Sequence, residues 1–262
     1  MKLFSFRNLR VLVLLMLLAT AAIYTHGQRL DSTDWIDPLE VMVFPVNGDG
    51  DPATAVYIKG LTDADFAPID RFTGRQGEKY DLLADPPTLT RIGPLVSSGP
   101  PEPPEIGANV LSSVFWSLRM RYWAWKHTPD DVSNRERVRI FVRYQQPDGG
   151  EPLVHSLGLQ KGLLGLVYAY ADESQNARNN LVITHELLHT VGATDKYGPG
   201  GVPLFPDGFA EPDRKPFFPQ RRCEIMAGRV MLSEEVVEMA SGLRQCLVGK
   251  ATAREIGWIE GD

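Results

Sequence analysis

The sequence lacks an excess of basic residues, a long apolar run and a supply of cysteines. It has 27 lysines and arginines against 33 aspartates and glutamates, and the resulting net charge of −6 argues against nucleic acid as a general partner. Only two cysteines are present, Cys223 and Cys246, so the chain can form at most one internal disulfide. The remaining composition, with 43% hydrophobic and 23% charged residues, is ordinary for a globular protein.

The longest apolar run covers residues 11–24 and is short for a membrane span. Its length suits the core of a signal peptide, with a small-residue cleavage site at residues 19–21 and with basic residues before it, namely Lys2, Arg7 and Arg10. An uncleaved signal anchor, with its basic flank in the cytoplasm, is the competing interpretation. Both interpretations place the bulk of the protein outside the cytoplasm, where it is either secreted or periplasmic, or attached to the membrane by this segment.

The rest of the chain is predicted to form a single domain. We assign residues 1–24 to the signal peptide or signal anchor, residues 25–38 to a polar linker and residues 39–262 to the domain. Without the N-terminal segment about 235 residues remain, which is enough for one sizeable hydrophobic core.

The pattern H-E-x-x-H-x-x-G-x-x-D is the most informative stretch of the chain. On a helix, His185 and His189 lie on the same face one turn apart, so both imidazoles can reach one metal ion. Gly192 allows the helix to stop and the chain to turn, and the turn can bring Asp195 to the same ion. Glu186, beside the first histidine, can reach a metal-bound water as a general base. Two histidines, a carboxylate and an open position are typical of catalytic zinc sites.

An H-E-x-x-H pattern also occurs by chance on a partly buried helix with a structural histidine. Three observations favour the metal site. The chain has only five histidines, and two of them fall at ligand spacing. Apolar residues continue a helical pattern through residues 179–191, and the glycine and the third ligand follow at suitable offsets. We therefore predict one Zn²⁺ ion bound by His185, His189 and Asp195.

A second motif, C-E-I-M-A-G at residues 223–228, resembles the Met-turn of the metzincin metallopeptidases, where a methionine lies beneath the zinc-binding histidines. Together the two motifs resemble a metzincin over residues 179–228. The commonest metzincin pattern ends in histidine where this chain has Asp195, a variant similar to the snapalysin-type small bacterial neutral proteases. The resemblance implies Asp195 as third ligand, Glu186 as base and Met226 as the Met-turn methionine.

The pattern of apolar residues predicts an α/β (α+β) fold, in which a twisted mixed sheet of about four or five strands is backed by helices. The resemblance implies that this sheet is metzincin-like. The zinc-binding helix lies at a cleft, and the C-terminal subdomain is irregular because residues 198–219 are rich in glycine and proline. Strands are expected at 39–46, 88–96, 138–144 and 162–171, and further helices at 62–80, 109–126 and 252–258.

Two of these elements have a second interpretation. The resemblance to metzincins implies that the strand at 162–171 is an edge strand that pairs with an extended peptide substrate, and the alternative is an ordinary buried strand. The helix at 109–126 carries an apolar stripe that we expect to pack in the core rather than to bind a ligand. The stripe consists of Leu111, Val114, Phe115, Leu118, Tyr122 and Trp125.

Three more residues are candidates for supporting roles. Tyr197 is close to the motif and could stabilise an oxyanion, although an exposed tyrosine after a turn is an equal alternative. Cys223 and Cys246 could pair in an oxidising compartment, and the bond would then clamp the Met-turn to the C-terminal segment. Cys223 is less suited as a zinc ligand, because three better-spaced ligands already exist.

These observations predict a zinc-dependent endopeptidase that acts on peptides or proteins outside the cytoplasm. Zn²⁺ would polarise the scissile carbonyl, and Glu186 would take a proton from water and pass it to the leaving amine. Two alternatives remain: a non-catalytic, zinc-stabilised envelope protein that binds a partner, and a metal-dependent amidase that acts on cell-wall peptides. A structural zinc site has no need of a carboxylate beside its first ligand, so Glu186 favours catalysis.

Overall fold

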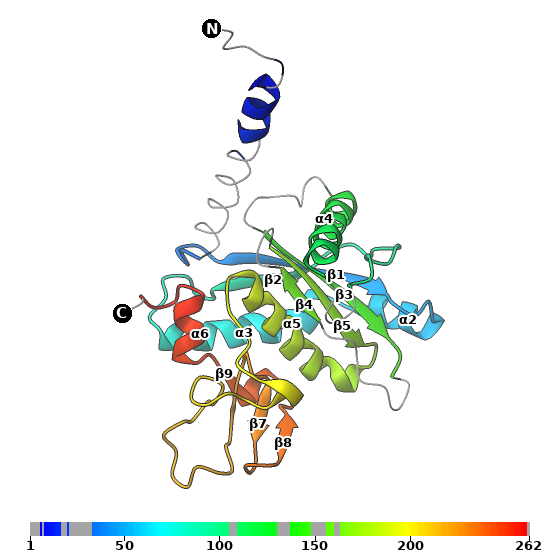
Figure 1. Ribbon diagram of the computed structural model, residues 1–262. Coiled ribbons are helices and arrows are strands. Elements are labelled where there is room, and N and C mark those ends of the chain that lie inside the picture. The colour runs from blue at the N-terminus through cyan, green and yellow to red at the C-terminus, as the bar shows by residue number, and fades with distance from the viewer. Residues whose placement is uncertain are drawn as a thin grey trace.

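The computed structural model describes residues 6, 8–16, 20, 33–104, 109–129, 137–147, 156–159 and 163–260. The centre of the molecule is a five-stranded sheet with strand order β2-β1-β3-β5-β4 (Figure 1). The four longer strands are parallel, and β4 pairs with β5 in antiparallel orientation. The strands are β1 (Leu39–Asn47), β2 (Thr88–Ile92), β3 (Arg137–Gln145), β4 (Leu157–Leu159) and β5 (Leu164–Tyr170). The predicted α/β class with a mixed sheet is confirmed.

The strands follow the β-branched and aromatic segments of the sequence, with two differences from the prediction. One strand, β2, is shorter than expected, and another, β4, was not predicted. β2 ends at Ile92 instead of continuing to Val96, because Pro94 cannot donate a hydrogen bond to the sheet. Val96 returns to the sheet through an isolated bridge with Val46. β5 is an interior strand, so its interpretation as an edge strand is wrong. The edge position belongs to β4, whose three residues are too few for a recognisable periodicity in the sequence.

Helices cover both faces of the sheet. α3 (Asp63–Lys79) and α5 (Asn176–Thr190) pack on one face, and α4 (Val110–His127) packs on the other (Figure 1). α2 (Pro52–Gly60) was not expected from the periodicity, although its start has strong signals. The Asp51 side chain accepts a hydrogen bond from the Ala53 amide, and the following proline occupies the first helical turn.

The expected core face of α4 is wrong. The helix forms over nearly the predicted residues, but Trp116, Met120 and Ala124 are the buried ones. They pack against Phe44 and Phe141 of the sheet. The stripe that was expected in the core is exposed instead. Both faces of α4 are apolar, and since the sheet can bury only one of them, periodicity alone does not identify which.

The packed part of the chain begins before β1. Trp35, within the segment predicted as a linker, is 3% exposed. Its indole nitrogen donates to the carbonyl oxygen of Ile256 at 2.7 Å, and its ring meets that of Trp258 edge-on. Most of the predicted signal peptide or anchor lies outside the described residues. Within its described part, residues 8–16 are helical. Among the described residues, no helix is long and apolar enough to cross a membrane.

The C-terminal part contains short strands joined by irregular segments, as residues 198–219 predict. β6 (Cys223–Glu224) pairs with β9 (Cys246–Leu247), and β7 (Arg229–Met231) pairs with β8 (Val237–Met239). The disulfide between Cys223 and Cys246 is formed, with 4.5 Å between the two Cα atoms. α6 (Lys250–Glu255) lies slightly before the predicted helix at 252–258. Single-turn helices occur at η1 (Glu173–Gln175), η2 (Pro199–Gly201) and η3 (Leu243–Gln245).

Candidate metal centre

α5 is fixed to the sheet by its first turns and carries the motif in its second half. The Asn179 side chain donates to the Tyr170 carbonyl at 2.9 Å and accepts from the Tyr170 amide at 3.3 Å, which joins the helix to the end of β5. Asn180 donates to the carbonyl of Asp65 on α3 at 2.7 Å. These bonds set the depth at which α5 lies, so that His185 and Glu186 are 9% and 5% exposed.

Three potential ligand atoms converge at the end of α5. The Nε2 atoms of His185 and His189 are 3.1 Å apart, and each lies 3.1 Å from Oδ1 of Asp195. Ligands of a tetrahedral zinc ion lie about 3.3 Å from one another when the metal–ligand distances are about 2.0–2.1 Å. Two nitrogens and one carboxylate oxygen at this spacing fit a zinc ion. The same three residues were selected from the sequence, and the structure brings all of them together.

The other ring nitrogens determine how the histidines are oriented. Nδ1 of His185 lies 3.0 Å from the carbonyl oxygen of Ile225, and Nδ1 of His189 lies 2.7 Å from that of Ala193. A carbonyl oxygen can only accept, so each Nδ1 must carry a hydrogen. In a neutral imidazole, Nε2 then has its lone pair free to coordinate a metal. Both rings are therefore held in the tautomer that a metal centre needs.

The electrostatics of the cluster keep Asp195 ionised. Burial alone would raise the pKa of Asp195, but its polar contacts with His185 and His189 hold this pKa well below its usual range. Burial alone would lower the pKa of His185, whereas its bond to Asp195 and the charge of Glu186 raise it. The cluster thus concentrates negative charge around two imidazoles, which favours a cation at their centre.

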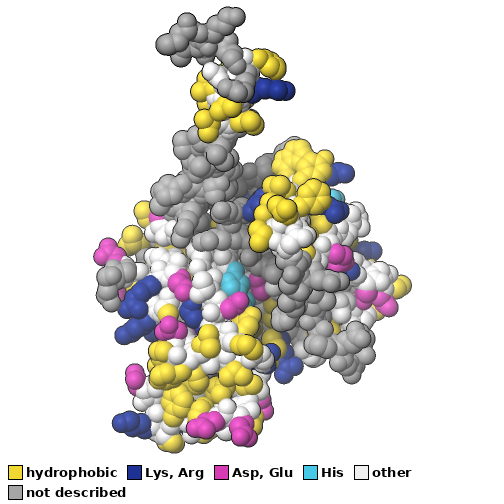
Figure 2. All heavy atoms as spheres, viewed as in Figure 1, with side chains coloured by type: hydrophobic (Ala, Val, Ile, Leu, Met, Phe, Trp, Pro, Cys, Tyr) yellow, Lys and Arg dark blue, Asp and Glu magenta, His cyan; other side chains and the backbone are white. Residues whose placement is uncertain are grey.

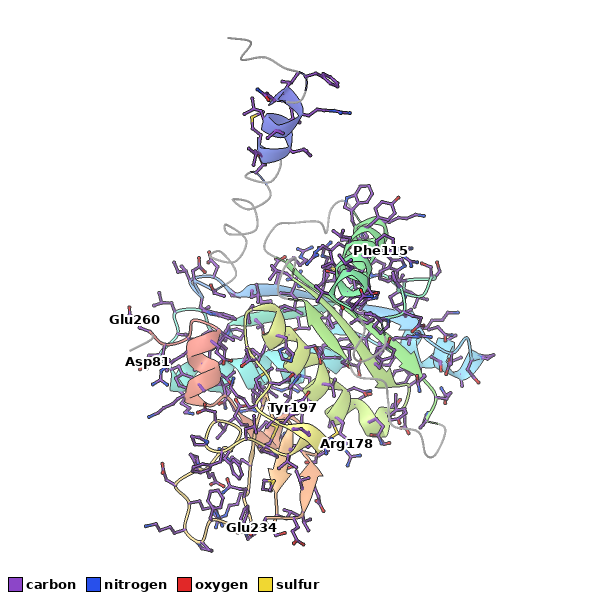
Figure 3. All side chains as sticks on the ribbon, in the orientation of Figure 1. Asp81, Phe115, Arg178, Tyr197, Glu234 and Glu260 are labelled. Carbon is purple, nitrogen blue, oxygen red and sulfur yellow. A yellow bond between two sulfur atoms is a disulfide. The ribbon has the colours of Figure 1, made fainter. Side chains whose placement is uncertain are left out.

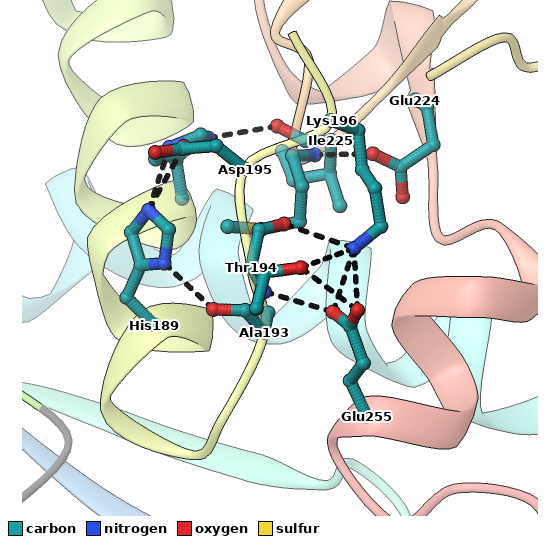
Figure 4. A network of polar contacts seen from close by, with 10 residues as sticks. His189, Ala193, Thr194, Asp195, Lys196, Glu224, Ile225 and Glu255 are labelled. Atoms are coloured by element: carbon teal, nitrogen blue, oxygen red, sulfur yellow. Dashed lines mark hydrogen bonds and ion pairs between the residues drawn. The ribbon is translucent and has the colours of Figure 1, made fainter. Parts of the chain in front are cut away.

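The loop that carries Asp195 is held on both sides (Figure 4). Gly192 has φ +116° and lets the chain leave the helix. Glu255 of α6 accepts from the amide and hydroxyl of Thr194, and its carboxylate lies 2.6 Å from the buried ammonium of Lys196. The backbone amide of Lys196 donates to the carbonyl of Met226 at 3.1 Å. Asp195 is therefore positioned by a neighbour on each side, and neither Lys196 nor Glu255 was predicted from the sequence.

The turn at residues 223–228 is organised by a buried carboxylate. Glu224 is fully buried and accepts hydrogen bonds from the Met226 amide, the Gly249 amide and the Thr252 hydroxyl. Burial raises its pKa, although these three bonds favour the charged form. Met226 is also fully buried. These bonds fix the turn around Ile225, whose carbonyl oxygen accepts the hydrogen bond from Nδ1 of His185. Sequence analysis did not predict this role of Glu224. The available signal was its position as a charged residue directly before an apolar segment.

Glu186 and Tyr197 lie around the cluster. The charge of Glu186 raises the pKa of His185 and contributes to the raised pKa of Tyr197, so this carboxylate is within electrostatic range of both. Tyr197 is half-buried, and its ring centroid is 6.3 Å from that of His185. Burial and the charge of Asp195 raise the pKa of Tyr197 to about 12, so its hydroxyl keeps its proton at neutral pH. Figure 3 labels Tyr197 beside α5.

The cluster is accessible from solvent. The Asp195 side chain is 45% exposed, whereas those of His185 and His189 are 11% and 17% exposed. Figure 2 shows a histidine and a neighbouring acidic side chain at the surface in the middle of one face. The three converging atoms can therefore be reached from solvent.

No protein-family model matches the chain, and a search of curated protein sequences found no match. The sequence motif and the geometry of the cluster are therefore the basis on which a function can be inferred.

Proposed function

We propose that the protein is a zinc-dependent endopeptidase. The observation that carries this proposal is the convergence of Nε2 of His185, Nε2 of His189 and Oδ1 of Asp195 at mutual distances of 3.1 Å, with the buried Glu186 beside them. Their chemistry suits zinc, which prefers imidazole nitrogen and carboxylate oxygen in catalytic sites with three protein ligands.

The residues divide the chemistry between them. When bound, zinc would polarise the scissile carbonyl and make a water molecule acidic enough to attack it. Glu186 would accept the proton of that water and deliver it to the leaving amine, which balances the proton over the reaction. Glu186 is buried next to the first histidine of the cluster, a position that suits a general base for a metal-bound water. His185, His189 and Asp195 serve only as ligands.

Tyr197 is a candidate donor to the negative charge that develops on the substrate oxygen. Its pKa of about 12 keeps the hydroxyl protonated over the physiological range, as a hydrogen-bond donor requires. Tyr197 follows the ligand Asp195 by two residues, and its ring lies near that of His185. Both features support a position close to the reacting carbonyl.

An extended peptide would be recognised at the edge of the sheet. β4 is the terminal strand and contacts α5, which carries the metal cluster. An edge strand offers backbone hydrogen bonds to any peptide, independent of its side chains. This arrangement favours a peptide or protein substrate. It moves the expected β-augmentation from residues 162–171 to β4.

The remaining predictions of the sequence extend this proposal. The resemblance to metzincins with a third aspartate ligand gives the same roles to His185, Glu186, His189 and Asp195, and makes Met226 the Met-turn methionine. A disulfide is typical of proteins outside the cytoplasm, so the bonded cysteines support the extracytoplasmic location. The N-terminal segment would either anchor the protein in the membrane or be removed on export.

Incubation of the zinc-loaded protein with a broad peptide library, followed by mass spectrometry, tests the proposal. We expect internal cleavage that a chelator abolishes and that added zinc restores. Peptidoglycan fragments serve as a parallel substrate. Cleavage of those fragments alone would favour the amidase, and retention of zinc without any cleavage would favour the non-catalytic binding protein.

A further inference from the structure

α4 has two apolar faces, and only one of them is covered. Its inner face packs on the sheet, whereas its outer face exposes large apolar side chains at helical spacing. The outer face comprises Leu111 (79% exposed), Val114 (52%), Phe115 (65%), Leu118 (58%), Tyr122 (65%) and Trp125 (64%). Figure 2 shows hydrophobic side chains gathered over α4, and Figure 3 labels Phe115 on this helix. Soluble monomers rarely expose apolar residues in such a continuous group.

The charges on α4 are all of one sign. The helix contains Arg119, Arg121 and Lys126 but no aspartate or glutamate, in a chain whose net charge is −6. Because successive helical residues are about 100° apart, Lys126 and Arg119 lie along one edge of the outer apolar face, and Arg121 lies along the other edge. The outer face is therefore an apolar and aromatic strip with positive charge on both sides.

This pattern matches a membrane-surface helix better than a protein-binding helix. Tyrosine and tryptophan suit the boundary between lipid chains and water, and flanking arginine and lysine can reach the headgroup phosphates. A second copy of α4 would bring like charges together along both edges of the strip. Positive edges without any acidic residue are complementary to an anionic bilayer.

The position of α4 in the molecule also favours contact with a bilayer. Figure 1 shows the apolar N-terminal helix and α4 projecting from the same side of the sheet, while α5 lies on the other side. The described part of the N-terminal helix also exposes large apolar side chains, such as Leu14 at 65% and Leu15 at 56%. Contact through α4 would leave the metal cluster facing away from the lipid.

We propose that the outer face of α4 docks on the surface of a lipid bilayer that contains anionic headgroups. The helix lies in the plane of the interface, with Leu111, Phe115 and Leu118 among the acyl chains and with its basic residues at the phosphates. This contact is separate from any attachment through residues 1–24, and it does not require peptidase activity.

The test uses the full chain with an environment-sensitive fluorophore on a single introduced cysteine. Both natural cysteines are in the disulfide, so Phe115→Cys can be labelled selectively. Glu234→Cys, at an exposed position far from α4 in Figure 3, is the matched control. We expect the Phe115→Cys label to shift to the blue with phosphatidylglycerol-containing vesicles, less so with phosphatidylcholine alone, and the Glu234→Cys label not to shift.

Two further variants separate docking by α4 from simple proximity to the membrane. Combining Leu118→Asp with Trp125→Asp alters only exposed positions and should abolish the shift. Combining Arg119→Gln with Lys126→Gln should reduce the shift in anionic vesicles to that seen in phosphatidylcholine. The proposal is overturned if the shift survives Leu118→Asp with Trp125→Asp, or if both labels respond equally. A shift that grows with protein concentration in the absence of lipid would assign the face to a second copy instead.

Discussion

α4 and α5 depart from the usual pattern of soluble helices in opposite directions. α5 buries polar side chains, whereas α4 exposes apolar ones. The buried polar residues of α5 are Asn179, Asn180, Thr184, His185, Glu186 and Thr190. Each departure costs free energy relative to a conventional amphipathic helix. Such costs are usually retained where a helix interacts with something besides its own core, and the two helices point to two different interactions.

The two departures differ in how the fold compensates for them. On α5, the polar groups are bonded within the domain: the Thr184 hydroxyl donates to the Asn180 carbonyl at 2.8 Å, and both histidines bond backbone carbonyls. On α4, nothing in the described part of the chain covers the outer side chains. A metal ion would complete the arrangement on α5, and a lipid surface would complete the one on α4.

Among the changes that test this comparison, removal of a proposed ligand from α5 or the loop after it should have the largest effect, measured as a loss of zinc affinity. Asp195→Ala deletes one of the three proposed ligands. We expect zinc affinity to fall by more than about 100-fold, because loss of a residue that only supports a ligand already costs about 10–100-fold. Elemental analysis and competition with a chelator measure the change. Asp207→Ala, an exposed acid outside the cluster, is the control. Full zinc content and full activity in Asp195→Ala would place the third ligand elsewhere.

The two faces of α4 should respond differently to the same kind of truncation. Met120 is fully buried, and Met120→Ala should destabilise the protein by about 2–5 kcal/mol because it leaves a cavity. Leu118 is 58% exposed, and Leu118→Ala should change stability by less than about 0.5 kcal/mol. Denaturant unfolding gives both values. Equal losses would mean that the outer face is packed after all.

A smaller effect is expected where α6 supports the Asp195 loop. Glu255→Gln removes the charge that pairs with Lys196 but keeps a side chain of the same size. Asp195 would be less well oriented, and zinc affinity should fall about 10-fold. Chelator competition is again the measurement, with the exposed Glu238→Gln as control. Unchanged affinity in Glu255→Gln would remove the ion pair from the account of how Asp195 is positioned.

The parts of the site that sequence analysis predicted are those governed by local geometry. His185 and His189 are four residues apart on one helix, and Gly192 permits the turn to Asp195, so the convergence of these three side chains follows from their spacing. The support of that loop could not be predicted in the same way. Lys196 and Glu255 are 59 residues apart, and only the tertiary fold brings α6 to the loop.

The fold was predictable to a similar extent. Strands such as β1 and β3 are long and β-branched, so their positions were clear, whereas β4 has only three residues and gives no period. α4 was located correctly but turned the wrong way, since a helix with two apolar faces has no unique core side in its sequence. The apolar stripe that was expected in the core is the outer face of α4, and this exposed face is the basis of the proposed lipid contact.

The central claim is that the buried polar side of α5 performs hydrolysis, and Glu186 tests it most directly. Glu186→Gln keeps the size of the side chain but cannot accept the proton, and the residue is not among the metal ligands. The measurement is the rate of peptide cleavage by wild type and Glu186→Gln at equal zinc content. We expect the variant to fold, to retain zinc and to be slower by about 10²–10⁴-fold. Equal rates at equal zinc content would contradict the proposed mechanism.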